Sequence, residues 1–172
     1  LAAYELYLKG RDSRNRDGVG TRSALQRQET LFQAAVELDS KFAPAWGELA
    51  VVHGHQISLR FDQTPGRKAK AKAAIERAVD LSPGSPDVIR SLGSYYSFVQ
   101  RDYTRATEEF EKLAQLQPND PSVYYSLGAI QRRQGRWADA ILNLNKAARD
   151  DPGNRLAGTN LSLVLQSCRR FD

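Results

Sequence analysis

The chain has 172 residues, of which 41% are hydrophobic and 26% are charged, and its formal net charge at pH 7 is +5. This length suits one ordinary domain, and no run of about 18 apolar residues is present to span a membrane. The only cysteine, Cys168, cannot form an internal disulfide and cannot by itself hold a metal.

The first predicted repeat spans residues 2–42 and contains two helices. The apolar pattern of its first helix is degenerate. The second helix follows the i, i+3, i+4, i+7 spacing of an amphipathic helix, with core positions at Leu31, Phe32, Ala35 and Leu38. The stretch "RDGVGTRS" between them lacks the lysine and the glycine spacing of a phosphate-binding loop. We therefore predict that Gly18 and Gly20 turn the chain and that Thr21 or Ser23 caps the next helix.

The second predicted repeat spans residues 43–85, and its first helix carries the motif "HGH" at 53–55. Two histidines so close together raise the question of a metal site. On a helix, residues two apart point roughly 200° apart, so His53 and His55 cannot bind one ion. A zinc site also needs about four ligands, and the chain has no other histidine. We predict no metal and no cofactor, and we interpret this stretch as ordinary helix surface.

The third and fourth predicted repeats span residues 86–120 and 121–154, and both contain the tripeptide Ser-Leu-Gly, at 91–93 and at 126–128. Each repeat begins with a capping side chain before a proline, which is typical of a helix start. Pro-Gly or Pro-Asn pairs end the second helices, and Gly135 separates the two helices of the fourth repeat. A final helix, residues 155–170, would expose Gln166, Arg169 and Arg170 and cover the last apolar face.

The recurrence of these features every 34 or 35 residues is typical of arrays of helical repeats. Small residues recur at fixed positions of both helices, where they would let two backbones approach closely: Gly93, Gly128, Ala106 and Ala140. One such helical hairpin cannot bury its own apolar face, so each hairpin depends on its neighbours.

These residues resemble the tetratricopeptide-repeat family. The eight signature positions of the fourth repeat hold Tyr124, Leu127, Gly128, Gln131, Ala140, Leu144, Ala147 and Pro152. Those of the third repeat hold Ile89, Leu92, Gly93, Tyr96, Ala106, Phe110, Leu113 and Pro118. The resemblance implies an all-α, right-handed solenoid of helix-turn-helix hairpins with a C-terminal capping helix, forming one array over residues 1–172.

Two stretches depart from the family pattern. Between Ala50 and Ala71 the chain has about nine extra residues, which we interpret as a longer first helix and a longer turn centred on Thr64, Pro65 and Gly66. The opening "AYELYLKGRDSRNR" resembles the start of repeat arrays in bacterial multidomain regulators that carry a kinase, cyclase or winged-helix domain. Because the chain also lacks methionine, we expect it to be a fragment of such a larger regulatory protein.

The resemblance also implies a concave groove lined by the first helix of each repeat. The groove would combine small hydroxyl side chains, two aromatic rings and several arginines, which suit a peptide with carboxylate or phosphate groups. The predicted groove residues are Asp87, Arg90, Ser94, Phe98, Tyr125, Ala129, Arg132, Arg133 and Asn160. The lysines and asparagines with which some family members clamp a terminal carboxylate are absent, because those positions hold Gly47, Val51, Ser91, Ser122 and Ser126.

No catalytic signature is present, since Cys168 has no nearby histidine and the paired carboxylates have surface patterns. We therefore predict a non-catalytic scaffold that binds a protein or peptide segment, without membrane insertion by this segment. An alternative is a basic accessory domain that contacts nucleic acid through Arg67, Lys68 and Lys72, although no exposed aromatic residues accompany them. A third is self-association through the ends of the array. The compartment stays open.

Overall fold

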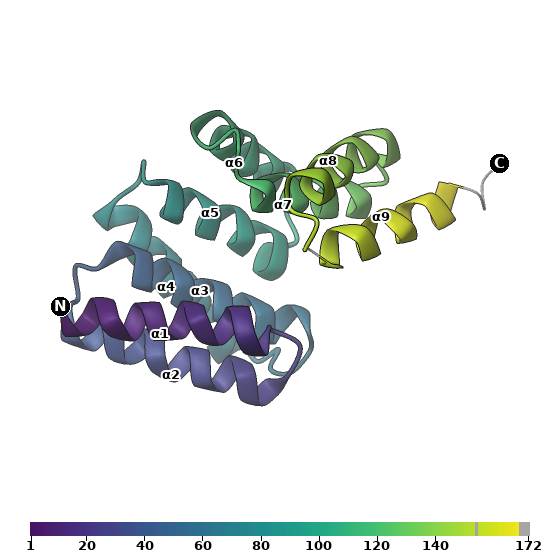
Figure 1. Cartoon of the computed structure of the whole chain (residues 1–172). Coiled ribbons are helices and arrows are strands. Elements are labelled where there is room, and N and C mark those ends of the chain that lie inside the picture. The colour runs from purple at the N-terminus through teal and green to yellow at the C-terminus, as the bar shows by residue number, and fades with distance from the viewer. Residues whose placement is uncertain (154, 169–172) are drawn as a thin grey trace. The chain divides into compact units, whose positions relative to one another are not determined.

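The computed structural model describes residues 1–153 and 155–168, and every regular element in these ranges is a helix (Figure 1). The predicted all-α fold is therefore confirmed. The helices in chain order are α1 (Ala2–Asp17), α2 (Arg22–Leu38), α3 (Ala43–Ser58), α4 (Pro65–Leu81), α5 (Pro86–Tyr95), the π-helix η1 (Tyr96–Gln100), α6 (Tyr103–Leu116), α7 (Pro121–Arg133), α8 (Trp137–Asp150) and α9 (Arg155–Cys168).

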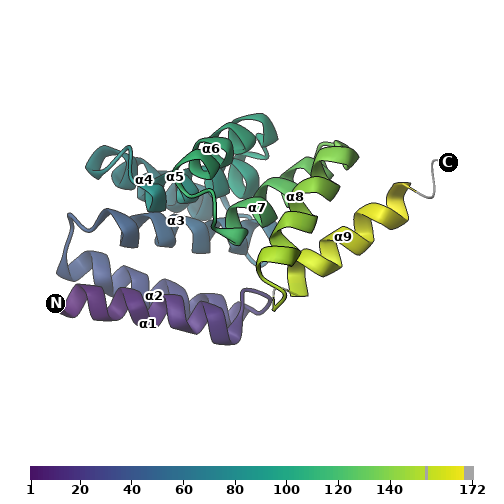
Figure 2. The ribbon, with the colours of Figure 1, turned by 45° about the horizontal axis from the view of Figure 1, so that its top comes forward.

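The chain forms two compact units, Leu1–Arg101 and Asp102–Asp172, which we call the N-terminal and C-terminal units. In the N-terminal unit α1 lies beside α2, and α3 packs against α2, α4 and α5 (Figures 1 and 2). In the C-terminal unit α7 packs against α6 and α8, and α9 lies against α8. The assignment of all helices to one continuous array stays a prediction.

Each unit has a core of side chains that the helical spacing places on facing sides. In the N-terminal unit Phe32 is completely buried and packs with other apolar residues of the first five helices. In the C-terminal unit Val164 of α9 packs with Ala140 and Leu144 of α8, so α9 covers an apolar face as predicted. Gln166 is exposed, also as predicted, whereas Arg169 and Arg170 lie outside the described residues.

The predicted helix boundaries have the expected local chemistry. Gly18 ends α1 with a φ of 69°, in the left-handed region that glycine adopts without strain. The Thr21 hydroxyl then accepts a hydrogen bond from the Ala24 amide and caps α2. Ser85 and Asp120 cap α5 and α7 in the same way, each before a proline that starts the helix. The predictions for these turns and caps are confirmed.

Close backbone approach is confirmed at Gly128. A Cβ atom at this position would lie 2.6 Å from Leu144 Cγ and 3.1 Å from the carbonyl oxygen of Ala140. Only glycine therefore fits where α7 crosses α8.

The first helix of the first repeat is present as α1 despite its degenerate apolar pattern, and Gly10 of α1 lets the Phe32 ring pack directly on the backbone. Two details of the sequence interpretation are corrected. Leu38 is 61% exposed rather than buried, because it is the last residue of α2 and lies beyond its packed face. The turn after α3 lies at residues 59–64, and Pro65 already belongs to α4, because Thr64 caps that helix. The first helix of the second repeat, α3, has 16 residues, against 13 in α7 and 15 in α5 and η1 together, so it is three residues longer than α7 and one longer than the helix of the third repeat.

Candidate functional site

Five of the predicted groove residues come together between α7 and α9 in the C-terminal unit. The Arg132 Nε–H donates a hydrogen bond to Asn160 Oδ1 at 3.1 Å. The Asn160 amide in turn donates to the Leu156 carbonyl oxygen at 3.0 Å and lies 3.5 Å from the Tyr125 hydroxyl. Ala129, one turn before Arg133 on α7, is buried beneath these polar groups. We call Tyr125, Arg132, Arg133 and Asn160 the α7–α9 cluster.

The α7–α9 cluster holds two guanidinium groups and no carboxylate. Arg133 donates to the carbonyl oxygen of Ala129 at 2.9 Å, and neither Arg132 nor Arg133 forms an ion pair with any residue that the structure describes. Partial burial lowers the pKa of Arg132, and the neighbouring charge of Arg133 lowers it further. Guanidinium groups offer five N–H donors each, so most donors of this pair remain available to an anionic group.

The other four predicted groove residues lie on α5 and η1 in the N-terminal unit. Asp87 is exposed in the first turn of α5, and the Ser94 hydroxyl donates to the Arg90 carbonyl oxygen at 2.9 Å. The half-buried Phe98 ring lies against the His55 ring, with 4.6 Å between the ring centroids. That one partner contacts both this face and the α7–α9 cluster stays a prediction.

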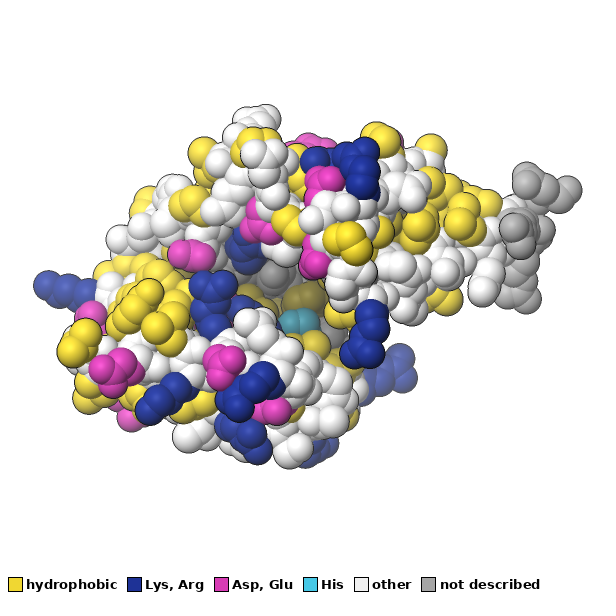
Figure 3. Space-filling view, in the orientation of Figure 1, with side chains coloured by type: hydrophobic (Ala, Val, Ile, Leu, Met, Phe, Trp, Pro, Cys, Tyr) yellow, Lys and Arg dark blue, Asp and Glu magenta, His cyan; other side chains and the backbone are white. Residues whose placement is uncertain are grey.

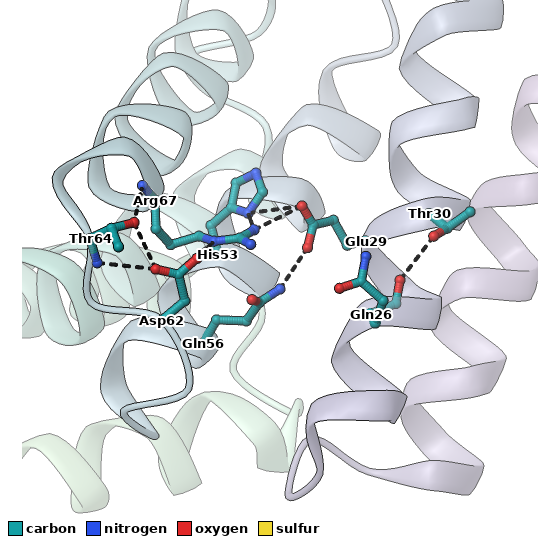
Figure 4. A network of polar contacts seen from close by, with 8 residues as sticks. All are labelled: Gln26, Glu29, Thr30, His53, Gln56, Asp62, Thr64 and Arg67. Carbon is teal, nitrogen blue, oxygen red and sulfur yellow. Dashed lines mark hydrogen bonds and ion pairs between the residues drawn. The ribbon is translucent and has the colours of Figure 1, made fainter.

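The interpretation of "HGH" as ordinary helix surface is wrong, because His53 is only 3% exposed. It belongs to a polar network between α2, α3 and α4 (Figure 4). The Arg67 guanidinium lies 2.8 Å from both His53 Nδ1 and Glu29 Oε1, and it donates through Nε to Asp62 Oδ2 at 3.0 Å. Gln56 also donates to Glu29, at 2.6 Å. The two histidines do point apart as predicted, since His55 faces Phe98 instead.

The charges of the Glu29–His53–Arg67 network are set by burial and by mutual contact. Burial lowers the pKa of His53 to about 4, so the imidazole is neutral at pH 7 and its Nδ1 can accept from Arg67. Burial alone would raise the pKa of Glu29, but hydrogen bonds from Arg67 and Gln56 hold it below its ordinary value. Hydrogen bonds from Thr64 and Arg67 lower the pKa of Asp62 to about 2. The network therefore holds one cation between two carboxylates at pH 7.

This network bears on the nucleic-acid alternative. Arg67 is held by Glu29 and Asp62, and its side chain is 12% exposed. Lys72 is exposed, but it pairs with Glu76 at 3.4 Å. On the face in Figure 3, basic and acidic side chains alternate over the N-terminal unit and form no continuous basic surface. Of the three basic residues named for this alternative, Arg67 and Lys72 are thus already paired within the fold, and only Lys68 forms no ion pair in the described residues.

Sequence reasoning missed the network because its members come from three helices and a turn. A histidine inside the apolar stretch of α3 was the one available signal of a buried position. Within the described ranges, no three His, Cys, Asp or Glu side chains gather closely enough to hold a metal ion. Nor does any described helix combine the length and the apolar character that crossing a membrane requires.

The comparisons with known proteins agree on the repeat type. Residues 97–155 match a family model described as tetratricopeptide repeat. The chain is 29% identical over 105 residues to protein O-mannosyl-transferase TMTC1 of Mus musculus, which covers 59% of this chain and 11% of that protein. It is 22% identical over 103 residues to anaphase-promoting complex subunit 3 of Schizosaccharomyces pombe. This alignment covers 60% of this chain and 15% of that protein. The chain thus spans a small part of these relatives.

Two solved structures share the fold. PilF of Pseudomonas aeruginosa has a TM-score of 0.67 at 18% identity, over 99% of this chain and 70% of that chain. YrrB, a tetratricopeptide-repeat protein with an unusual peptide-binding site, has a TM-score of 0.56 at 20% identity, over 86% and 71%. The family model thus identifies residues 97–155 as tetratricopeptide repeats, and the chain as a whole shares the fold of a solved tetratricopeptide-repeat protein.

Proposed function

We propose that the chain is a non-catalytic scaffold module of a larger regulatory protein, and that it binds a carboxylate-bearing segment of a partner protein at the α7–α9 cluster. Tetratricopeptide repeats generally mediate protein–protein or peptide binding, and scaffolds of this fold are generally non-catalytic. The peptide-binding site of YrrB, a protein of the same fold, supports this class of function.

The observation that carries the proposal is the pair of arginines without a carboxylate. Arg132 is half-buried and oriented by Asn160, and Arg133 is exposed beside it. A half-buried cation gains more from a carboxylate partner than a fully hydrated one, because water screens the pair less. Tyr125 supplies an aromatic surface next to these charges, and tyrosine and arginine are the residue types enriched at binding hot spots.

The face of α5 and η1 is the proposed second contact. Arg90, Ser94 and Phe98 combine a guanidinium group, a hydroxyl group and a half-exposed ring on successive turns.

Fluorescence anisotropy with labelled peptides tests the proposal. The probes are a pool of 12-residue peptides with Asp or Glu at every second position and a matched pool with Asn or Gln there. We expect the acidic pool to bind, and the double variant Arg132→Ala/Arg133→Ala to bind it at least tenfold more weakly. Arg149→Ala is the control, because this arginine is exposed on α8 and already pairs with Asp150.

The outcomes separate the parts of the proposal. Equal binding of both pools, or equal binding by the double variant and wild type, would reject the α7–α9 cluster as the site. A further loss on adding Arg90→Ala would support the second contact. Affinity that disappears equally with salt in wild type and both variants would indicate non-specific attraction to positive charge instead.

A further inference from the structure

The turn between α3 and α4, which carries the extra residues of the second repeat, borders a pocket in the N-terminal unit. The pocket has a volume of about 410 Å³. This volume lies within the range of about 300–1,000 Å³ that is usual for small-molecule sites. It is lined by residues of α3, the turn, α4, η1 and the residue after η1: Ile57, Gln63, Lys68, Val99, Gln100 and Arg101. None of them belongs to the proposed peptide-binding surface.

The polar lining of this pocket is cationic. It contains a lysine and an arginine, two amides and no acidic residue. In the part of the chain that the structure describes, Lys68 and Arg101 form no ion pair. The acid nearest in sequence to Lys68 is Asp62, whose carboxylate is already engaged by Thr64 and Arg67. Asp102, next to Arg101 in the sequence, pairs with Arg105 at 3.4 Å. The two lining cations thus have no ion-pair partner among the described residues.

The walls of the pocket are held in place by contacts on their far side. Arg67, next to Lys68, is fixed by Glu29 and Asp62. Arg22 of α2 donates to the Phe61 carbonyl oxygen at 2.7 Å, with its guanidinium carbon 5.4 Å from the Phe61 ring centre. The turn is therefore tied to α2 before any ligand binds. A site that is ordered in advance loses less entropy on binding.

The opposite wall has two unusual backbone features. The chain leaves α5 through the π-helix η1, and the Arg101 amide donates to the Tyr96 carbonyl oxygen. Arg101 itself has a φ of 56°, in the left-handed region that costs a non-glycine residue energy. π-Helical turns and strained residues occur frequently at functional sites. Glycine would fit Arg101's backbone better, but it would remove the guanidinium group.

We propose that this pocket binds a small anionic ligand, with its phosphate or carboxylate group between Lys68 and Arg101. The amides contribute hydrogen bonds around this group. The Gln63 Nε2–H donates to the Ile57 carbonyl oxygen at 3.4 Å and the Gln100 Nε2–H to the Tyr95 hydroxyl at 3.2 Å, which leaves each amide a second N–H. Ile57 and Val99 supply the apolar sides against which the rest of a small ligand would pack.

Titration followed by nuclear magnetic resonance tests this site, with inorganic phosphate and acetate as separate probes at constant ionic strength. We expect the amide signals of Gln63, Gln100 and Arg101 to shift saturably with at least one probe. Saturation with phosphate alone assigns a phosphate-bearing ligand, and saturation with acetate as well assigns a carboxylate. If neither phosphate nor acetate produces a saturable shift, the proposal is overturned.

A matched pair of variants separates this pocket from general positive charge. Lys68→Ala/Arg101→Gly removes both cations, and glycine relieves the left-handed backbone, so the fold should be retained. Lys72→Ala/Arg60→Gly makes the same changes outside the pocket, because Arg60 also has a positive φ, of 61°. We expect at least tenfold weaker binding by the first variant and less than a twofold change for the second. An equal loss in both would overturn the proposal, provided that circular dichroism shows equal helix content.

Discussion

Arg67 in the N-terminal unit and Arg132 in the C-terminal unit are the same residue type in opposite circumstances. Arg67 lies between Glu29 and Asp62 and also contacts His53, so its charge is compensated within the fold. Arg132 is held by the neutral amide of Asn160, and the charge of Arg133 lowers its pKa. The first arginine joins three helices, whereas the second has hydrogen-bonding capacity left for a partner. Neither the composition nor the net charge of the chain distinguishes these two arginines.

The difference follows from burial. A nearly buried guanidinium group must meet carboxylates, because an uncompensated buried charge is strongly unfavourable. A half-exposed one keeps part of its hydration and remains stable without an acid. A cluster of arginines therefore indicates binding only where burial is partial and acids are absent. This condition separates the α7–α9 cluster from the network around Arg67.

Acidification should have the largest effect, because it protonates two histidines of the N-terminal unit, His53 in the Arg67 network and His55 beside Phe98. Burial lowers the pKa of His53, and that of His55, to about 4 from an ordinary value of 6.5. Between pH 6.5 and 4 the unfolded chain binds protons that the folded chain does not, so the free energy of unfolding falls as the pH falls. We expect a loss on the order of 5 kcal/mol over this window, because both histidines contribute, measured by urea denaturation at each pH.

The control for this pH dependence is the variant His53→Gln/His55→Gln. It should lose most of the slope between pH 6.5 and 4. A second loss of stability should begin in both proteins below the ordinary pKa of Glu29, 4.5, because that carboxylate is ionised in the fold. An unchanged slope in the variant would show that the buried histidines do not govern the stability.

Removing each arginine in turn compares the two regions directly. Arg67→Ala leaves Glu29 and Asp62 without their cation, and we expect it to lower the free energy of unfolding by about 2 kcal/mol. Arg132→Ala breaks no ion pair and should change it by less than about 0.5 kcal/mol. Lys72→Ala, on the same helix as Arg67 but exposed, is the matched control and should behave like Arg132→Ala. Similar losses from Arg67→Ala and Arg132→Ala in thermal or urea denaturation would contradict the distinction.

An acidic residue beside Arg132 should give this arginine an internal ion-pair partner, as Arg67 already has. In the variant Asn160→Asp, the new carboxylate would stand 3.1 Å from Arg132 Nε, where the amide oxygen now lies. We expect a change of less than about 0.5 kcal/mol in the free energy of unfolding, because the partly exposed ion pair is offset by loss of the hydrogen bond from the Asn160 amide to the Leu156 carbonyl oxygen. The same change should weaken binding of the acidic peptide pool at least fivefold, since the internal carboxylate competes for the guanidinium group. Unchanged or stronger peptide binding would argue against recognition of carboxylates there.

The repeats could be predicted because their signals are local. Caps and turns involve backbone groups only a few residues away, as at Ser85, Asp120 and Gly18. They could therefore be predicted from the neighbouring residues in the sequence. Gly128 was recognised from its fixed position in the repeat, and the contact with Leu144 confirms the reason. The turn after α3 was misplaced because a proline occurs in turns as well as at the first position of a helix.

The polar groups of the candidate site also include some that the sequence could predict and some that it could not. The spacing of residues along α7 was sufficient to place Tyr125, Arg132 and Arg133 near one another. Asn160 lies 35 residues after Tyr125, which agrees with the repeat period and accounts for the approach of α9 to this part of α7. The network of Glu29, His53, Asp62 and Arg67 depends on how deeply three helices pack, which no local pattern encodes.

Periodicity, capping residues and small residues at fixed positions were thus enough to determine the helices and their repetition, because each of these acts over a few residues or recurs at a constant interval. Which charges are compensated was decided only by the tertiary structure. Burial and ion pairing depend on distances between segments far apart in the chain, such as Glu29 and Arg67, and these distances exist only once the helices have packed.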